Sequence, residues 1–264
     1  MTVKSALLRP ILSAALALAM TAAAQAETIK VGVTGGPHAQ IFEQVAALAK
    51  KDGIDVKVVE FDDYQIPNAA LAQGDLDLNS FQHQPFLDNQ VRDRGYRLVS
   101  IGKTVIFPIG LYSKTVKSLA QLKEGDKVAI PNDPTNGGRV LLLLQAQGLI
   151  KIRPEAGLKA TPLDITDNPR KLRIVELPAA QLARSLDDVA VAAVNGNYAL
   201  EVGLSPQKDA IALESVDSPY ANVIAVRSAD KDKPVLARLV ALYRSAEIKT
   251  FIKDKFGASV VPTF

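Results

Sequence analysis

The fold is decided by residues 29–38, which read IKVGVTGGPH. The first half of this stretch alternates apolar residues with polar residues or glycine, and a period of two is typical of a strand. Gly35-Gly36-Pro37 then ends the strand, and the apolar residues that follow recur at i, i+4 and i+7, which predicts a helix over residues 38–51. The chain therefore opens as the first half of a β–α–β unit, which joins parallel strands.

The same order continues along the chain. We expect a second strand over residues 54–61, a short helix over residues 67–73 that Gly74 closes, and a third strand at residues 76–78. Because strands alternate with helices, the pattern predicts a mostly parallel sheet that is covered by helices.

A second block of the same kind begins near the middle of the chain. Residues 127–131, KVAIP, are typical of a buried strand, and the turn-forming residues at 132–138 predict a loop. An apolar helix is expected over residues 139–147, then a helix over residues 179–186 and a buried strand over residues 189–194. Two α/β blocks in one chain predict two lobes.

Two segments are expected to carry the chain between the lobes, Thr104–Tyr112 and Tyr220–Arg227. The helical pattern of residues 235–256 is expected to return to the first lobe. Two crossings form a hinge, and the cleft at a hinge between α/β lobes is a common small-molecule site. The predicted division is lobe 1 over residues 27–108 and 222–264, and lobe 2 over residues 109–221.

The composition excludes several classes of function. The 264 residues include no cysteine and two histidines, which excludes disulfides, thiolate metal sites and thiol catalysis, and we predict no metal and no cofactor. The formal net charge of +3 is too near neutral for a protein that binds nucleic acid through a basic face.

The N-terminus is typical of an export signal. Two basic residues precede an apolar run over residues 11–24, and Ala24-Gln25-Ala26 is a small-x-small cleavage site. The apolar run is shorter than the ~18 residues that a membrane span needs. We therefore predict a signal over residues 1–26, a mature chain that begins at Glu27, and a soluble periplasmic protein without a lipid-anchor cysteine.

Arg139 is the first candidate for ligand binding. We expect it in the first turn of a helix, where its charge faces the positive end of the helix dipole. A guanidinium beside the free N–H groups of a helix start makes a receptor for a carboxylate. The spacing is equally consistent with an arginine that bends out to water or pairs with a surface acid.

A group of flat side chains follows the third predicted strand. Phe81, His83 and Phe86 lie within a segment expected to be a loop, and Tyr64 lies in the preceding loop. Aromatic rings on loops can form a pocket for an apolar or thioether side chain, because sulfur–ring contacts are worth ~0.3–1.5 kcal/mol each. Packing over the core is the simpler interpretation. His83 lacks the partners that a metal site or a catalytic triad needs, which favours a hydrogen-bonding role in a pocket wall.

Two asparagines are further candidates. Asn195 follows the buried strand 189–194, where it could cap a helix or offer its amide to a ligand. Asn222 lies in an apolar crossing segment, where a buried amide should have a backbone or ligand partner.

Several short motifs occur in order along nearly the whole chain after the export signal: GPHA at 36–39, YQIPNAAL at 64–71, NSFQHQPFL at 79–87, PNDPTN at 131–136, Arg139, NGNYA at 195–199 and SPYAN at 218–222. With these motifs the chain resembles the methionine-binding, NlpA-type substrate-binding proteins of bacterial ABC importers. The resemblance implies a type II periplasmic-binding-protein fold, in which two α/β lobes joined by two hinge crossings close on a free amino acid.

The resemblance also implies partners and contacts. The partners are a small amino acid and an inner-membrane ABC permease with its ATPase, and we expect a monomer without enzyme activity. The ligand contacts fall into two groups. Those for the amino and carboxylate groups are Arg139, Asn195 and Asn222, and those around the thioether are Tyr64, Phe81, His83 and Phe86.

The chain departs from the family pattern in two places. Family members usually carry a lipid-modified cysteine at the signal junction, which is absent here, and a tyrosine where this chain has Phe86. A site that bonds a polar group discriminates more strongly than an apolar one, so the lost hydroxyl leaves D-methionine, a methionine-containing dipeptide or another apolar amino acid as alternatives to L-methionine. An enzyme of amino-acid metabolism on the same fold and a ligand-free sensory or adhesive protein are the alternatives from other classes.

Overall fold

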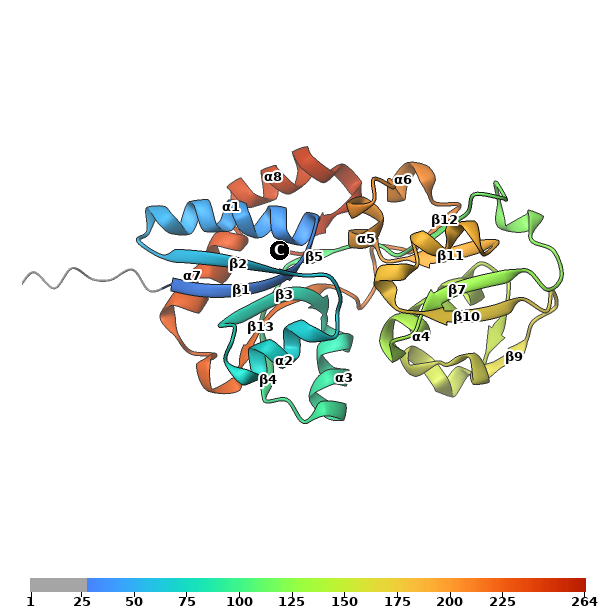
Figure 1. Cartoon of the computed structure of the whole chain (residues 1–264), viewed down its shortest axis with the longest axis horizontal. Coiled ribbons are helices and arrows are strands. Elements are labelled where there is room, and N and C mark those ends of the chain that lie inside the picture. Colours follow the sequence, from blue (N-terminus) through green and yellow to red (C-terminus); the bar gives the residue numbers. More distant parts are fainter. Residues whose placement is uncertain (1–27) are drawn as a thin grey trace, which may run out of the picture.

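The structure, a computed structural model, describes residues 28–264 (Figure 1). Its first sheet has the strand order β2-β1-β3-β13-β4. β1 pairs in parallel with β2 and β3, whereas β13 is antiparallel to both β3 and β4. The sheet therefore combines strands from both halves of the chain: β1 (Thr28–Thr34), β2 (Asp55–Phe61), β3 (Leu78–His83), β4 (Leu98–Lys103) and β13 (Asn222–Arg227).

Helices cover both faces of this sheet (Figure 1). On one face α1, α7 and α8 share a buried cluster that includes Phe42 and Tyr243. On the other face α2 and α3 pack through Leu71 and Leu87. The two C-terminal helices thus pack on the first sheet. The bounds are α1 Pro37–Lys51, α2 Ile66–Gln73, α3 Gln84–Arg94, α7 Pro234–Tyr243 and α8 Ala246–Phe256.

The second sheet has the strand order β10-β7-β11-β6-β12. β7 is parallel to β10 and β11, and β6 is antiparallel to β11 and β12. The strands are β6 (Gly110–Tyr112), β7 (Lys127–Pro131), β10 (Arg173–Leu177), β11 (Val191–Val194) and β12 (Ala212–Leu213), and the helices of this lobe are α4 (Pro134–Ala146), α5 (Gly196–Glu201) and α6 (Pro206–Asp209).

Two segments connect the lobes. Residues 107–109 run from β5 (Val105–Ile106) to β6, and residues 214–221 run from β12 to β13. The second crossing was expected at 220–227, but residues 222–227 are a paired strand of the first sheet, so the crossing precedes them. Two small pairs complete the strands: β5 with β14 (Val261–Pro262), and β8 (Lys151–Ile152) with β9 (Ile165–Asp167).

Two predicted loops are regular structure. Residues 79–83, expected in a loop, complete β3, and Phe86 lies in α3. Residues 134–138 were also expected in a loop, but α4 begins at Pro134 and includes them. Arg139 therefore lies in the second turn of the helix and not in the first. The predicted helix over residues 179–186 is instead two short 3₁₀ turns, Ala179–Gln181 and Arg184–Asp187.

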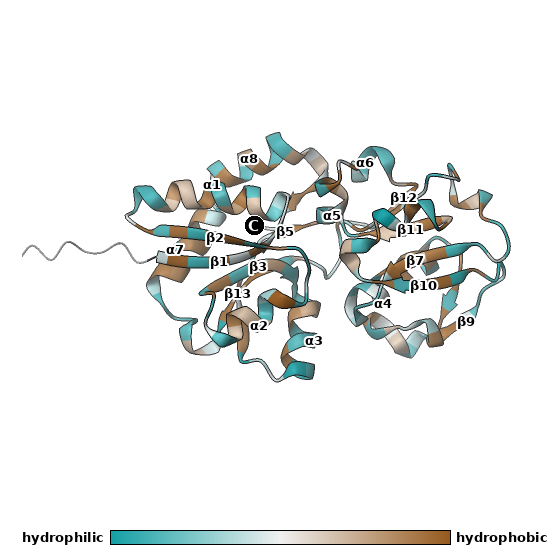
Figure 2. Cartoon of the chain, in the orientation of Figure 1, coloured by the Kyte–Doolittle hydropathy of each residue, from teal (hydrophilic) through white to brown (hydrophobic). Residues whose placement is uncertain are grey.

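Hydrophobic residues follow the strands of both sheets (Figure 2). β11 is fully buried, in agreement with its apolar sequence. Among the described helices, none is long and apolar enough to cross a membrane. The predicted export signal and its cleavage site lie outside the described residues.

Candidate functional site

A small cavity lies between the two lobes. All seven residues that the sequence singles out line it, together with four that it did not. The predicted residues are Tyr64, Phe81, His83, Phe86, Arg139, Asn195 and Asn222, and the additional ones are Gln82, Phe107, Asn136 and Asn197.

Lobe 1 contributes an aromatic wall to the cavity. The ring of Tyr64 lies 5.9 Å from the ring of Phe81 and 6.0 Å from that of Phe86, and the two phenylalanine rings are 6.0 Å apart in an edge-to-face arrangement. All three residues are buried. Edge-to-face packing of this kind fixes ring orientations, so the wall is a rigid apolar surface.

A buried amide cluster holds the aromatic wall in place. Gln82 and Asn68 exchange two hydrogen bonds of 2.7 Å each, and Gln82 also donates to Asn79 at 3.0 Å. The cluster ties β3 to α2, directly after the loop that carries Tyr64. It also explains why a strand with so many polar residues can be buried, because its amides are satisfied by one another.

His83 is the hydrogen-bonding residue that ends the wall. Its Nδ1 accepts from the backbone N–H of Phe86 at 3.1 Å and caps α3. Since Nδ1 is an acceptor, the ring proton is on Nε2, which donates to Oδ1 of Asn136 at 3.1 Å across the lobes. Burial, with a further contribution from Arg139, lowers the pKa of His83 to about 3, so the ring is neutral at pH 7.

Asn136 is a junction between the lobes that the sequence analysis quoted only as part of a motif. Asp133 caps α4 and holds the Asn136 side-chain amide with both carboxylate oxygens. Oδ1 of Asn136 accepts from His83 and from Nδ2 of Asn195, the latter at 2.9 Å. Within residues 28–264 the buried Oδ1 of Asn195 has no hydrogen-bond partner, so an acceptor is left for a ligand.

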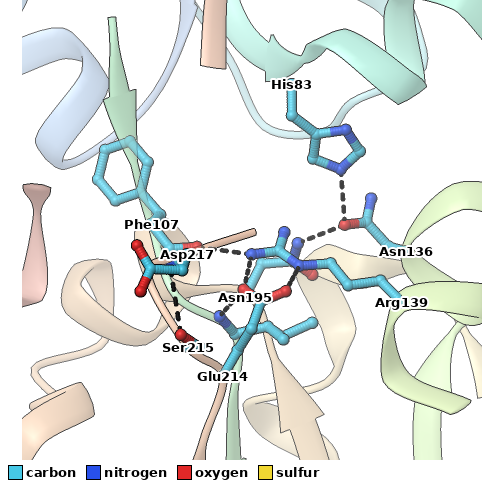
Figure 3. Close-up of polar contacts among 9 residues, drawn as sticks. His83, Phe107, Asn136, Arg139, Asn195, Glu214, Ser215 and Asp217 are labelled. Atoms are coloured by element: carbon cyan, nitrogen blue, oxygen red, sulfur yellow. Dashed lines mark hydrogen bonds and ion pairs between the residues drawn. The ribbon is translucent and has the colours of Figure 1, made fainter. Parts of the chain in front are cut away.

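Arg139 lies in this cavity and not in bulk water, since it is 3% exposed (Figure 3). Its Nε donates to Oε1 of Glu214 at 2.8 Å, and its Nη2 donates to Oε2 of Glu214 and to the backbone oxygen of Phe107. Its guanidinium carbon lies 4.4 Å from the ring centre of Tyr220. A guanidinium has five N–H donors, and Nη1, with two of them, has no partner among the described residues. The sequence left open whether Arg139 bends out to water or pairs with a surface acid; it pairs with Glu214, whose side chain is largely but not fully buried.

Direct hydrogen bonds close the cavity between the lobes. The Tyr64 hydroxyl of lobe 1 donates to Oδ1 of Asn197 in lobe 2 at 2.5 Å. Burial raises the pKa of the Tyr64 hydroxyl well above its usual range, so the donor proton stays in place at neutral pH. The Tyr198 hydroxyl of lobe 2 donates to the backbone oxygen of Asp62 in lobe 1 at 3.2 Å. The described lobes are therefore in a closed arrangement.

The arrangement suits binding more than chemistry. A guanidinium edge and an amide oxygen at one side of the cavity complement a carboxylate and an ammonium, and the rings opposite complement an apolar side chain. No group of acidic and histidine side chains among the described residues has metal-site geometry. A closed polar-and-aromatic cavity at the hinge of two α/β lobes defines the class of bilobed substrate-binding proteins.

Comparison with known proteins places the chain within this class. A model described as "NlpA lipoprotein" matches residues 29–264, and the chain belongs to that family. The D-methionine-binding lipoprotein MetQ of Salmonella typhimurium is 51% identical over 88% of this chain and 87% of its own length. Outer membrane lipoprotein 3 of Mannheimia haemolytica is 50% identical over 90% of both chains.

A solved structure agrees with the fold. The structure of a nutrient binding protein from Burkholderia cenocepacia bound to methionine is 57% identical, with a TM-score of 0.88, and covers 89% of this chain and 100% of that chain. The prediction of a type II periplasmic-binding-protein fold, with two lobes and two hinge crossings, is confirmed.

The comparisons correct the predicted localisation. We expected a soluble protein without a lipid anchor, because the chain has no cysteine. The matching family is described as a lipoprotein family, however, and both curated relatives are named lipoproteins. The prediction of an anchor-free protein is therefore wrong for this class, whereas a periplasmic location is consistent with it.

The sequence pointed to some of the additional residues and not to others. Asn136 lies in the motif PNDPTN and Asn197 in NGNYA, so the sequence offers a reason to choose each of them. Phe107 lies in the predicted first crossing, where only a hinge role was considered. Glu214 had no signal, because it is 75 positions from Arg139 and in a segment without a motif.

Proposed function

We propose that the protein is the substrate-binding component of an ABC-type amino-acid importer, and that it holds methionine or a close analogue in the inter-lobe cavity. The observation that carries this proposal is that the guanidinium of Arg139, from lobe 2, lines the same closed cavity as the aromatic wall of lobe 1. A ligand that touches both would stabilise the closed state, because a ligand shifts an equilibrium only by its differential affinity for the two states.

The head group of the ligand would bind on the lobe 2 side. The two N–H donors of Arg139 Nη1 would hold the carboxylate, as a charge-assisted pair. The unpaired Oδ1 of Asn195 would accept from the ammonium group. Asn222, at the end of β13 nearest His83, lines the cavity and would complete the polar contacts.

The side chain of the ligand would lie against the aromatic wall. Tyr64, Phe81 and Phe86 offer ring faces and edges, and a thioether gains from sulfur–ring contacts. Phe86 presents no hydroxyl, so this end of the cavity favours an apolar tail. The name of the Salmonella relative, D-methionine-binding, and the methionine-bound Burkholderia structure support methionine as the ligand. Leucine-like amino acids and methionine-containing dipeptides remain the alternatives to test.

The remaining parts of the proposal concern partners and organisation. We propose binding without catalysis, an inner-membrane permease with its ATPase as the partner, and a monomeric receptor in the periplasm. We also propose lobe boundaries at 108/109 and 221/222, which the composition of the two sheets supports.

Titration calorimetry tests the proposed function. L-methionine, D-methionine, leucine and alanine are each titrated into the protein after unfolding and refolding, which removes any retained ligand. We expect heat from at least one methionine enantiomer and a matching rise in the melting temperature. The absence of both responses for all four amino acids would contradict the proposal. Disappearance of methionine during an overnight incubation, followed by NMR, would instead indicate an enzyme.

A further inference from the structure

The charge in the cavity is already balanced before a ligand arrives. Arg139 is the one charged side chain among the lining residues that the structure describes, and its partner Glu214 lies behind it, with 10% of the side chain exposed. The Glu214 carboxylate accepts from Nε and from one N–H of Nη2. These two donors form one edge of the guanidinium, and Nη1 lies on the other side of it. Nη1, which has no partner among residues 28–264, is thus left for a ligand in the cavity that Arg139 lines, while the ion pair as a whole is neutral.

Glu214 is also fixed to both crossings of the hinge. It is the first residue of the second crossing, and its backbone N–H donates to the backbone oxygen of Ile109 at 3.0 Å. The backbone N–H of Ile109 donates to Glu214 Oε2 at 3.3 Å in return, and Arg139 donates to Phe107 in the same crossing. Three N–H donors, from Arg139 and Ile109, thus hold the carboxylate beside the guanidinium (Figure 3).

We propose that Glu214 is a specificity-determining residue that makes the closed cavity select a zwitterion over an anion. A ligand carboxylate on Nη1 meets a guanidinium whose charge Glu214 already balances. A zwitterion brings its own ammonium and adds no net charge, whereas a plain carboxylate adds an uncompensated negative charge to a buried site. The inference rests on the proposed function, because it assumes that an amino-acid head group binds at Arg139.

Other charged or titratable groups near the cavity strengthen this selection. His83 is neutral at pH 7. Asp133, which caps α4 behind Asn136, adds negative charge on the lobe 2 side. Neither of these groups supplies a cation that could balance an extra carboxylate.

The test compares two ligands that differ in one group. Methionine and 4-(methylthio)butanoate, which is methionine with hydrogen in place of the α-amino group, are titrated at pH 7 into the wild-type protein, Glu214→Gln and Glu214→Asp. Glu214→Gln keeps the size of the side chain and removes the charge, so the preference for methionine should fall by about tenfold or more. Glu214→Asp keeps the charge and should retain the preference, whatever its effect on both affinities.

A matched control shows whether the effect is local. Glu124→Gln makes the same chemical change in lobe 2, in an exposed ion pair with Lys171, and should change neither affinity nor preference. An unchanged ligand preference in Glu214→Gln overturns the inference, and so does a wild-type protein that binds both ligands within about threefold. The second criterion needs no variant to fold. Failure of the wild-type protein to bind methionine at all would overturn the proposed function instead.

Discussion

At the scale of single residues, the site is described best by the polar atoms that the protein leaves unused. The contacts of Arg139 use three of its five donors, and Asn195 donates from Nδ2 to Asn136 while its Oδ1 has no partner among residues 28–264. Two other amides of the cavity are engaged, Gln82 with Asn68 and Asn197 with the Tyr64 hydroxyl. Binding should therefore be sensitive to a few atoms and insensitive to nearby surface charge.

Arg139→Ala should weaken methionine binding by about 100-fold or more, because breaking a buried charge contact costs ~2–5 kcal/mol. It also leaves the largely buried carboxylate of Glu214 without its cation, so the melting temperature should fall as well. Calorimetry measures the affinity, on protein that circular dichroism shows to be folded. Lys114→Ala, which removes an exposed cation of the same lobe, should bind normally. An Arg139→Ala affinity within about twofold of the wild-type value would exclude the carboxylate contact.

Tyr64→Ala should reduce the specificity of the site for the side chain of the bound amino acid. The ring packs on Phe81 and Phe86, so its removal opens the apolar end of the cavity. We expect the preference for methionine over alanine to fall by about tenfold, because each apolar group in a pocket contributes ~1–3 kcal/mol. Tyr64→Phe, which keeps the ring and loses the bond to Asn197, should weaken both ligands equally. Equal losses for methionine and alanine in Tyr64→Ala would contradict the role of the wall.

At the scale of elements, strands and helices could be predicted well from the sequence where the local pattern of apolar residues alone determines the element. β1, α1 and β7 lie within a residue or two of their predicted bounds, because apolar periodicity determines them locally. The third strand was predicted at residues 76–78 but runs from Leu78 to His83, because its polar residues resemble a loop until Asn68 and Gln82 are known to bond each other.

The start of α4 was missed for a related reason. Gly137 and Gly138 are poor helix formers, but a Cβ at Gly138 would lie 2.7 Å from the backbone oxygen of Leu158. Close packing requires glycine there, and tertiary contacts override the local preference. The Arg139–Glu214 pair is likewise a product of the fold and had no local sequence signal.

Two helices begin at buried histidines, and this predicts how stability depends on pH. His38 lies in the first turn of α1 and His83 caps α3, and burial lowers the pKa of each to about 3. In the unfolded chain a histidine has a pKa of about 6.5, so between these values the unfolded state binds a proton that the native state does not. Stability is therefore complete above pH ~6.5 and falls as the pH is lowered towards 3.

Denaturant titrations at pH 7 and pH 5 measure this loss. Each histidine should contribute about 2 kcal/mol of destabilisation between the two pH values. His83→Asn keeps an acceptor that can cap α3, and should remove about half of the combined loss. An identical pH dependence in the wild-type protein and in His83→Asn would show that His83 titrates normally in the folded protein.

At the scale of the whole molecule, closure is held by contacts of two kinds. Some involve residues that line the cavity, such as Tyr64 with Asn197. Others lie outside it, such as the bond from Tyr198 to the backbone of Asp62. A bond of the second kind stabilises the closed state without touching the ligand. It should therefore affect the dissociation rate of the ligand and not the specificity for one ligand over another.

Tyr198→Phe tests this separation. The variant keeps the ring of residue 198, whose centre lies 4.9 Å from the centre of the Tyr64 ring, and loses only the inter-lobe hydrogen bond. Because a buried hydrogen bond is worth ~0.5–1.5 kcal/mol, the dissociation rate of methionine should rise by about two- to tenfold. The preference for methionine over alanine should not change. Stopped-flow fluorescence or surface plasmon resonance measures the rates.

Tyr112→Phe makes the same change inside lobe 2, at a hydroxyl without a partner among residues 28–264, and should leave the dissociation rate unaltered. Equal dissociation rates for Tyr198→Phe and Tyr112→Phe would show that this bond does not hold the lobes together.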